Sequence, residues 1–167
     1  MQESILTDIL SAAVAYDGAD PKRIHHLLKV HAFARLIARG ENCDAHTCFV
    51  LEAAAALHDI GIHEAERVHG SNAGVYQQME GPAVARELLR PFALSSADTD
   101  RICWLIGHHH TYHPVDGLDH QILLEADFLV NAYESSLPAY AIRYFHDNTA
   151  RTATGKALLC SLYLPED

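Results

Sequence analysis

The stretch Leu51-Glu52-Ala53-Ala54-Ala55-Ala56-Leu57-His58-Asp59-Ile60-Gly61 decides how this 167-residue chain folds and where its chemistry lies. Its first seven residues form an alanine-rich apolar run, which is typical of a buried helix that a neighbouring helix can approach closely. Gly61 predicts the end of that helix. His58 and Asp59 are both metal-ligand residues, so the sequence predicts a divalent cation where the helix ends.

Three further polar residues, His26, His109 and Asp127, recur at helical spacing with apolar residues, so we expect them to point inward. Taken singly, each has an ordinary structural explanation, because a buried histidine usually bonds a carbonyl oxygen and a buried aspartate usually caps a helix or pairs with a cation. Asp127, however, has no Lys or Arg within one helical turn to neutralise it. One shared cation would satisfy all of these groups together.

The order His26, His58-Asp59, Asp127 resembles that of the HD superfamily of metal-dependent phosphohydrolases, over about residues 20–135. The resemblance implies an all-α fold, a compact single-domain helical bundle of the HD-domain type. It also implies a divalent metal ion held by His26, His58, Asp59 and Asp127, and hydrolysis of a small phosphate ester, with a nucleotide among the candidates. We take residues 1–167 as that one domain.

The resemblance also suggests the catalytic roles. Asp59 would ligate the ion and orient the attacking water, and His109 would steady the phosphate or protonate the leaving oxygen. In the triplet 108–110, helix phase favours His109 as the inward residue and places His108 at the edge of the stripe, toward Trp104, as a candidate substrate contact. Lys29, one turn after His26, is a candidate phosphate contact, although a lysine whose head reaches into solvent is the more ordinary interpretation.

Two departures from the family pattern limit the resemblance. Ile62 occupies the position where many relatives have a phosphate-binding Lys. Relatives with two metals carry a ligand His at the start of the next helix, and the nearest match in this chain is Gln77, which is a poor substitute ligand. Glu80 could replace that ligand, but just before Gly81 and Pro82 it could equally be an acidic residue at a helix start. One metal ion is therefore favoured over two, and its identity stays open among Mn, Co, Fe, Ni, Zn and Mg.

Two other functions fit the same motifs. Some HD relatives bind two irons and oxidise carbon with dioxygen, which would make the chain a di-iron oxygenase, although they need a fuller ligand set. The absence of a Lys after Gly61 leaves room for a regulatory domain that binds metal without turnover.

The charge composition limits which classes of molecule the chain is expected to bind. The chain has 12 Lys and Arg against 22 Asp and Glu, a net charge of −10, so we do not expect it to bind long nucleic acid. A small phosphorylated molecule remains a possible partner, because the charge of a local metal outweighs the net charge of the chain at short range.

No basic leader or apolar stretch of about 18 residues is present, so no membrane association and a cytoplasmic location are expected. The four cysteines form no C-x-x-C unit and predict reduced thiols. Homo-oligomerisation stays open.

Helical periodicity dominates the chain, and no alternation typical of strands occurs. A polar segment over residues 61–79 is expected to cover the site as a short lid. The predicted helices span residues 2–16, 21–40, 44–60, 82–90, a segment from Ser95 to His109, 119–135, 138–148 and 153–163.

Overall fold

The computed structural model describes residues 2–165, and within them the chain forms nine α-helices and no strand, which confirms the all-α prediction. The helices are α1 (Gln2–Asp17), α2 (Pro21–Gly40), α3 (Ala45–Leu57), α4 (Ile62–His69), α5 (Gly74–Leu89), α6 (Ser96–Ile106), α7 (Gly117–Glu134), α8 (Ala139–Asn148) and α9 (Ala153–Tyr163).

Side chains just before four helices explain where those helices begin. Asp20 accepts a hydrogen bond from the backbone N–H of Arg23, and Asp44 caps α3 in the same way. Ser95 accepts from the N–H of Asp98 at the start of α6, and Thr152 caps α9. Each cap satisfies an N–H group that has no partner inside its helix.

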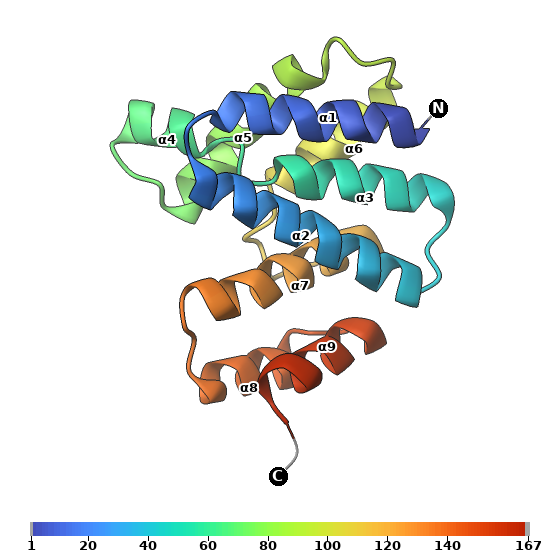
Figure 1. Cartoon of the computed structure of the whole chain (residues 1–167), viewed down its shortest axis with the longest axis vertical. Coiled ribbons are helices and arrows are strands. Elements are labelled where there is room, and N and C mark those ends of the chain that lie inside the picture. The colour runs from blue at the N-terminus through green and yellow to red at the C-terminus, as the bar shows by residue number, and fades with distance from the viewer. Residues whose placement is uncertain (1, 166–167) are drawn as a thin grey trace.

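The helices are arranged in layers around α2 (Figure 1). α2 packs against both α3 and α7, while α1 lies over α3, and α8 and α9 lie on the far side of α7. The alanines of α3, residues 53–56, are fully buried or nearly so, and their small side chains let the neighbouring helices approach. This packing brings the end of α3 between α2 and α7.

Most of the segment 61–79 is helical, so its prediction as a polar excursion without helices is wrong, and the irregular part is confined to residues 70–73 between α4 and α5. α4 occupies residues 62–69, and α5 begins at Gly74, eight residues before the predicted start at Pro82. Gly70, Ser71 and Asn72, which suggested the excursion, lie in that irregular part, whereas Gln78 lies within α5 and its side chain accepts hydrogen bonds from the backbone N–H of His110 and the hydroxyl of Thr111.

Gly61 has a different role from the predicted helix stop. α3 already ends at Leu57, and Gly61 adopts ordinary right-handed backbone angles before α4. A Cβ atom on Gly61 would lie 2.5 Å from the backbone nitrogen of Gly81. Glycine is therefore needed for close approach of α5 to the turn that carries His58 and Asp59.

α6 also ends earlier than predicted, at Ile106, so His109 lies in the turn that follows the helix. Among the residues described, none of the helices combines the length and the hydropathy that a membrane span requires.

Candidate metal centre

Ligand atoms from three parts of the chain converge at the end of α3. Nε2 of His26, on α2, lies 3.2 Å from Oδ1 of Asp127, on α7, and 3.5 Å from Oδ2 of Asp59. Nε2 of His58 lies 3.6 Å from each of these carboxylate oxygens and 3.1 Å from Nε2 of His26. Such separations suit donors that each lie about 2.0–2.2 Å from one shared ion.

Hydrogen bonds on the other ring nitrogens fix how the two imidazoles point. Nδ1 of His26 lies 2.8 Å from a carboxylate oxygen of Glu134, and Nδ1 of His58 lies 2.8 Å from the carbonyl oxygen of Ala55. Because each Nδ1 donates a proton to its oxygen, Nε2 presents a lone pair to the cluster. Two lone pairs that face each other and two carboxylates repel one another unless a proton or a cation lies between them.

Asp59 connects this group to a second one. Its other oxygen, Oδ1, lies 3.4 Å from Nε2 of His109, a fully buried atom that has no hydrogen-bond partner. Asp59, His109 and His110 form a second set of ligand atoms within 4.8 Å of one another. The Nε2 atom of His110 also lies 3.1 Å from the Gln77 side-chain oxygen. The residues present thus fit one ion at the first group and offer donors for another, whereas the sequence favoured a single metal.

Gly74, the first residue of α5, makes room for the second group. A Cβ atom at this position would lie 2.6 Å from the ring of His110, closer than van der Waals contact allows. The ring of His110 in turn lies 4.0 Å, centroid to centroid, from that of His109. A side chain at Gly74 would therefore displace His110 and with it the second set of ligand atoms.

The electrostatics of the cluster follow from this crowding. Burial alone would lower the pKa of His58, but the carboxylates of Asp59 and Asp127 outweigh it and raise the pKa to about 9. Burial would raise the pKa values of both aspartates, yet the surrounding imidazoles hold them below the ordinary value. Without metal, the cluster therefore balances its carboxylates with protonated imidazole, which a divalent cation would displace.

A polar cleft of about 250 Å³ leads to the cluster from the surface. Its lining includes His26 and Asp59 of the cluster, and charged residues of both signs, namely Lys22, Arg23, Asp20 and Glu134. Arg23 is held by an ion pair of 2.8 Å with Glu66, so its position is fixed by the fold. The cleft admits a small polar molecule to the exposed side of Asp59.

Two predicted substrate contacts lie elsewhere. The ring of His108 stacks on that of Trp104 with centroids 4.0 Å apart, and its Nδ1 bonds the Trp104 carbonyl oxygen, so the structure does not bring it to the cluster. Lys29 forms an ion pair with Glu134, behind His26 rather than in front of it.

The interpretation of Glu80 as a helix-start residue is wrong. This glutamate lies within α5 and pairs with His69 at 2.8 Å. That contact also keeps its carboxylate out of both groups of ligand atoms, so it does not replace the missing histidine ligand.

Sequence reasoning missed two supporting residues on α7. Glu134 orients His26, and the Asn131 side chain donates a hydrogen bond of 2.7 Å to Oδ1 of Asp127. The available signal was their spacing, because residues 127, 131 and 134 recur on one helical face. Such a face of polar residues beside a predicted ligand indicates groups that position it.

A comparison with protein families finds one match. The family model described as the HD domain matches residues 23–142, which is more than half of the chain and includes His26, His58, Asp59, His109 and Asp127. No curated protein and no solved structure matches the chain.

Proposed function

The chain belongs to the HD-domain family, and from that premise we propose that it is a metal-dependent phosphohydrolase acting on a small phosphate ester. The observation that carries the proposal is the convergence of Nε2 of His26 and His58 with the carboxylate oxygens of Asp59 and Asp127, which only protons or a cation between them can balance. We assign these four residues as the metal ligands.

A bound divalent ion would lower the pKa of a bound water molecule and polarise a phosphoryl oxygen. The residues of the chain supply the positioning. Asp59 has one oxygen in each group of ligand atoms, so it can orient the attacking water toward a phosphate at the open end of the cleft. Nδ1 of His109 donates to the carbonyl oxygen of Ile106, so its buried Nε2 atom, 3.4 Å from Oδ1 of Asp59, can hold a phosphate oxygen or donate a proton to the leaving oxygen when the ring is protonated.

The donor set favours particular metals. Imidazole and carboxylate groups together suit Mn, Co, Fe, Ni and Zn better than Mg, which prefers oxygen ligands and retains its water. We propose that the first group holds one such ion, and that the group of Asp59, His109 and His110 is where any second ion would bind.

Phosphate release tests this function directly. The protein is stripped with a chelator, reloaded in turn with Mn²⁺, Co²⁺, Fe²⁺, Ni²⁺ or Zn²⁺, and assayed for inorganic phosphate against a panel of phosphate monoesters. We expect turnover only in the loaded protein, and its loss in the variant Asp59→Asn. No phosphate from any ester with any of the five metals would contradict the proposal and leave a regulatory metal-binding domain.

The second group of ligand atoms favours one other candidate, a di-iron oxygenase, because that chemistry requires donors for two irons and Asp59 contributes an oxygen to each group. Oxygen consumption by the iron-loaded protein distinguishes the two functions. Phosphate release that persists without oxygen supports the hydrolase, whereas oxygen-dependent turnover of an organic substrate supports the oxygenase.

A further inference from the structure

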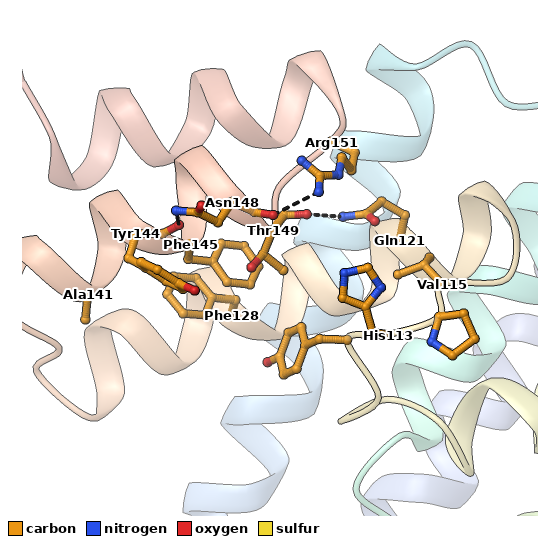
Figure 2. Close-up of a pocket in the computed structure, with 12 residues that line it drawn as sticks. His113, Val115, Gln121, Phe128, Ala141, Tyr144, Phe145, Asn148, Thr149 and Arg151 are labelled. Atoms are coloured by element: carbon orange, nitrogen blue, oxygen red, sulfur yellow. Dashed lines mark hydrogen bonds between the residues drawn. The ribbon is translucent and has the colours of Figure 1, made fainter.

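A second and larger cleft, of about 1000 Å³, lies between the segment 112–115, α7 and α8 (Figure 2). Pockets that bind small organic molecules usually have volumes of about 300–1000 Å³, so this cleft can hold such a molecule. It shares no lining residue with the polar cleft that leads to the metal cluster, and none of the proposed metal ligands lines it. It is therefore a separate site, and its own lining indicates what it can bind.

Aromatic rings form one wall of this cleft. The rings of Phe128 and Phe145 stack with centroids 3.6 Å apart and planes 5° from parallel, and the ring of Tyr112 meets Phe145 edge-on at 6.1 Å. Figure 2 shows Phe128, Tyr144 and Phe145 on the same side of the cleft. Tyr144 is 67% exposed although its ring is large and mostly apolar. Flat rings on a cleft wall are suited to stacking on a flat ligand.

Gln121, on α7, supplies a hydrogen-bond acceptor with a fixed direction. This residue lines the cleft but is only 6% exposed. Its side-chain nitrogen donates to the Glu125 carboxylate at 2.7 Å and to the carbonyl oxygen of Thr149 at 3.1 Å (Figure 2). Because both of its N–H hydrogens bind within the protein, the amide cannot flip without losing two hydrogen bonds. Its side-chain oxygen is the atom left to accept an N–H group of a ligand.

The charge of the cleft is positive. Its lining contains no Asp or Glu, although the chain as a whole has a net charge of −10. Arg151 is its one Lys or Arg residue, and one guanidinium nitrogen donates to the carbonyl oxygen of Asn148 at 2.9 Å (Figure 2). A guanidinium has five N–H donors, so this bond leaves others that can bind a carboxylate. The cleft therefore favours an anionic ligand over a cationic one.

We propose that this cleft binds a flat aromatic carboxylate that carries a ring N–H group. The ring stacks on the wall that includes Tyr144, the N–H group donates to the side-chain oxygen of Gln121, and the carboxylate accepts from Arg151. The site contains no metal ligand and catalyses no reaction, so it does not depend on the phosphohydrolase function proposed above.

The first test uses indole-3-acetate, which combines a flat ring, a ring N–H group and a carboxylate. Titration of the full chain is followed by amide chemical shifts, and we expect changes at residues 112–115 and 141–151. Tyr144→Ala should weaken binding about tenfold through loss of ring stacking. The matched control is Tyr140→Ala, which removes another tyrosine of α8 that is 78% exposed and outside the cleft. The control should bind like the parent.

The second test changes the polar groups of the ligand and of the cleft. In 1-benzothiophene-3-acetate a sulfur atom replaces the ring N–H group, so this compound should bind about fivefold more weakly. Arg151→Gln should weaken the binding of indole-3-acetate about fivefold and leave that of indole, which has no carboxylate, unchanged. The control Arg143→Gln changes an exposed arginine of α8 outside the cleft and should leave both affinities unchanged.

Three results would overturn the proposal. One is shift changes that map elsewhere, or the absence of saturable binding. Another is equal affinity in the Tyr144→Ala and Tyr140→Ala variants, or equal affinity for indole-3-acetate and for tryptamine, which carries an ammonium group instead of the carboxylate. The third is binding that requires metal, because the carboxylate would then bind an ion at the cluster. Equal affinity in the metal-loaded and the chelator-treated protein supports the proposal.

Discussion

Two buried carboxylates lie two residues apart on α7, and their surroundings differ in kind. Glu125 is fully buried, and its oxygens accept hydrogen bonds from the Gln121 amide, from the backbone N–H groups of Arg151 and Thr152, and from the Thr152 hydroxyl. Asp127 is also buried, but Asn131 is its one neutral donor, and its remaining neighbours are the imidazoles of the cluster.

The difference teaches how to separate a structural acid from a ligand. The donors around Glu125 are fixed by the fold, so this carboxylate joins α7 to the segment that leads into α9 without any added ion. A side chain at Gly155 would collide with it, which shows how closely that segment packs. Asp127 faces Nε2 of His26 and of His58, and these atoms, like its own carboxylate, require a proton or a cation to bind. A buried acid without enough donors therefore indicates a binding site.

The largest expected effect is a loss of activity on changing Asp127, which changing Glu125 should not cause. Asp127→Asn should lower kcat/KM at least about a thousandfold, because the variant removes the charge of a proposed metal ligand and leaves the cluster unbalanced. The variant also removes the stabilising pairing of the Asp127 carboxylate with the imidazoles of the metal-free cluster, so its kcat/KM is measured on protein shown to be folded by circular dichroism. A variant with full activity in the presence of Mn²⁺ would break the comparison.

The converse change should affect folding instead. Glu125→Ala leaves four donors without their acceptor, so we expect a loss of about 3 kcal/mol in the free energy of unfolding, measured by urea denaturation. The folded fraction should keep its metal content and its kcat/KM for ethyl phosphate. An unchanged free energy of unfolding would show that the Glu125 carboxylate does not stabilise the contact between α7 and the segment that leads into α9.

The stability of the metal-free protein should depend on pH through the charges of the cluster, to which Asp127 belongs and Glu125 does not. The pKa of His58 is raised from 6.5 to about 9 in the folded state, so its stabilising contribution is fully present below pH 6.5 and is lost as the pH rises toward 9. The pKa of Asp127 is lowered from 3.8, so its contribution is present above that pH and is lost as the pH falls below it.

Urea denaturation of the chelator-treated protein should therefore show the greatest stability contribution from the cluster between about pH 4 and 6.5, with a decline toward pH 9. Metal affinity should rise about tenfold per pH unit over the same decline, because the ion displaces the His58 proton. Denaturation midpoints and affinities that do not change from pH 6.5 to 9 would contradict the proposed charge balance.

The smallest expected effect extends the comparison to adjacent histidines. His108 has its ring stacked on Trp104 and its Nδ1 atom bonded, whereas Nε2 of His109 is buried without a partner. His108→Ala should change kcat/KM by less than about threefold, and His109→Ala should lower it about a hundredfold. Equal losses in the two variants would return His108 to the site as a substrate contact.

The sequence predicted well those elements whose signals are local. α2 begins at Pro21 after the Asp20 cap and ends at Gly40, as the sequence indicated, because cap, proline and glycine act within one turn. The two helices within the segment 61–79 were not predicted, because the turn signal of Gly70, Ser71 and Asn72 was extended to their polar neighbours, and the partners of Gln78 at residues 110 and 111 are distant in the chain.

In the candidate site too, the residues with a local sequence signal were predicted and those positioned by tertiary packing were missed. Helical spacing sufficed to select His26 and Asp127 as inward residues, and the structure places them beside His58 and Asp59. The role of Glu134 was missed, because a glutamate near a helix end is usually a surface residue, and only tertiary packing places it behind His26. Helix phase correctly directed His108 toward Trp104, but it did not reveal that stacking on Trp104 keeps the His108 ring away from the cluster.

The most direct test of the account is the metal content of the purified protein beside two variants of α7, Asp127→Ala and Glu125→Gln, each reloaded with Mn²⁺ and desalted. Elemental analysis should find at least one equivalent of metal per chain in the parent and in Glu125→Gln, and almost none in Asp127→Ala. A parent that takes up no metal, or an Asp127→Ala variant that retains it fully, would contradict a metal centre built on these four ligands.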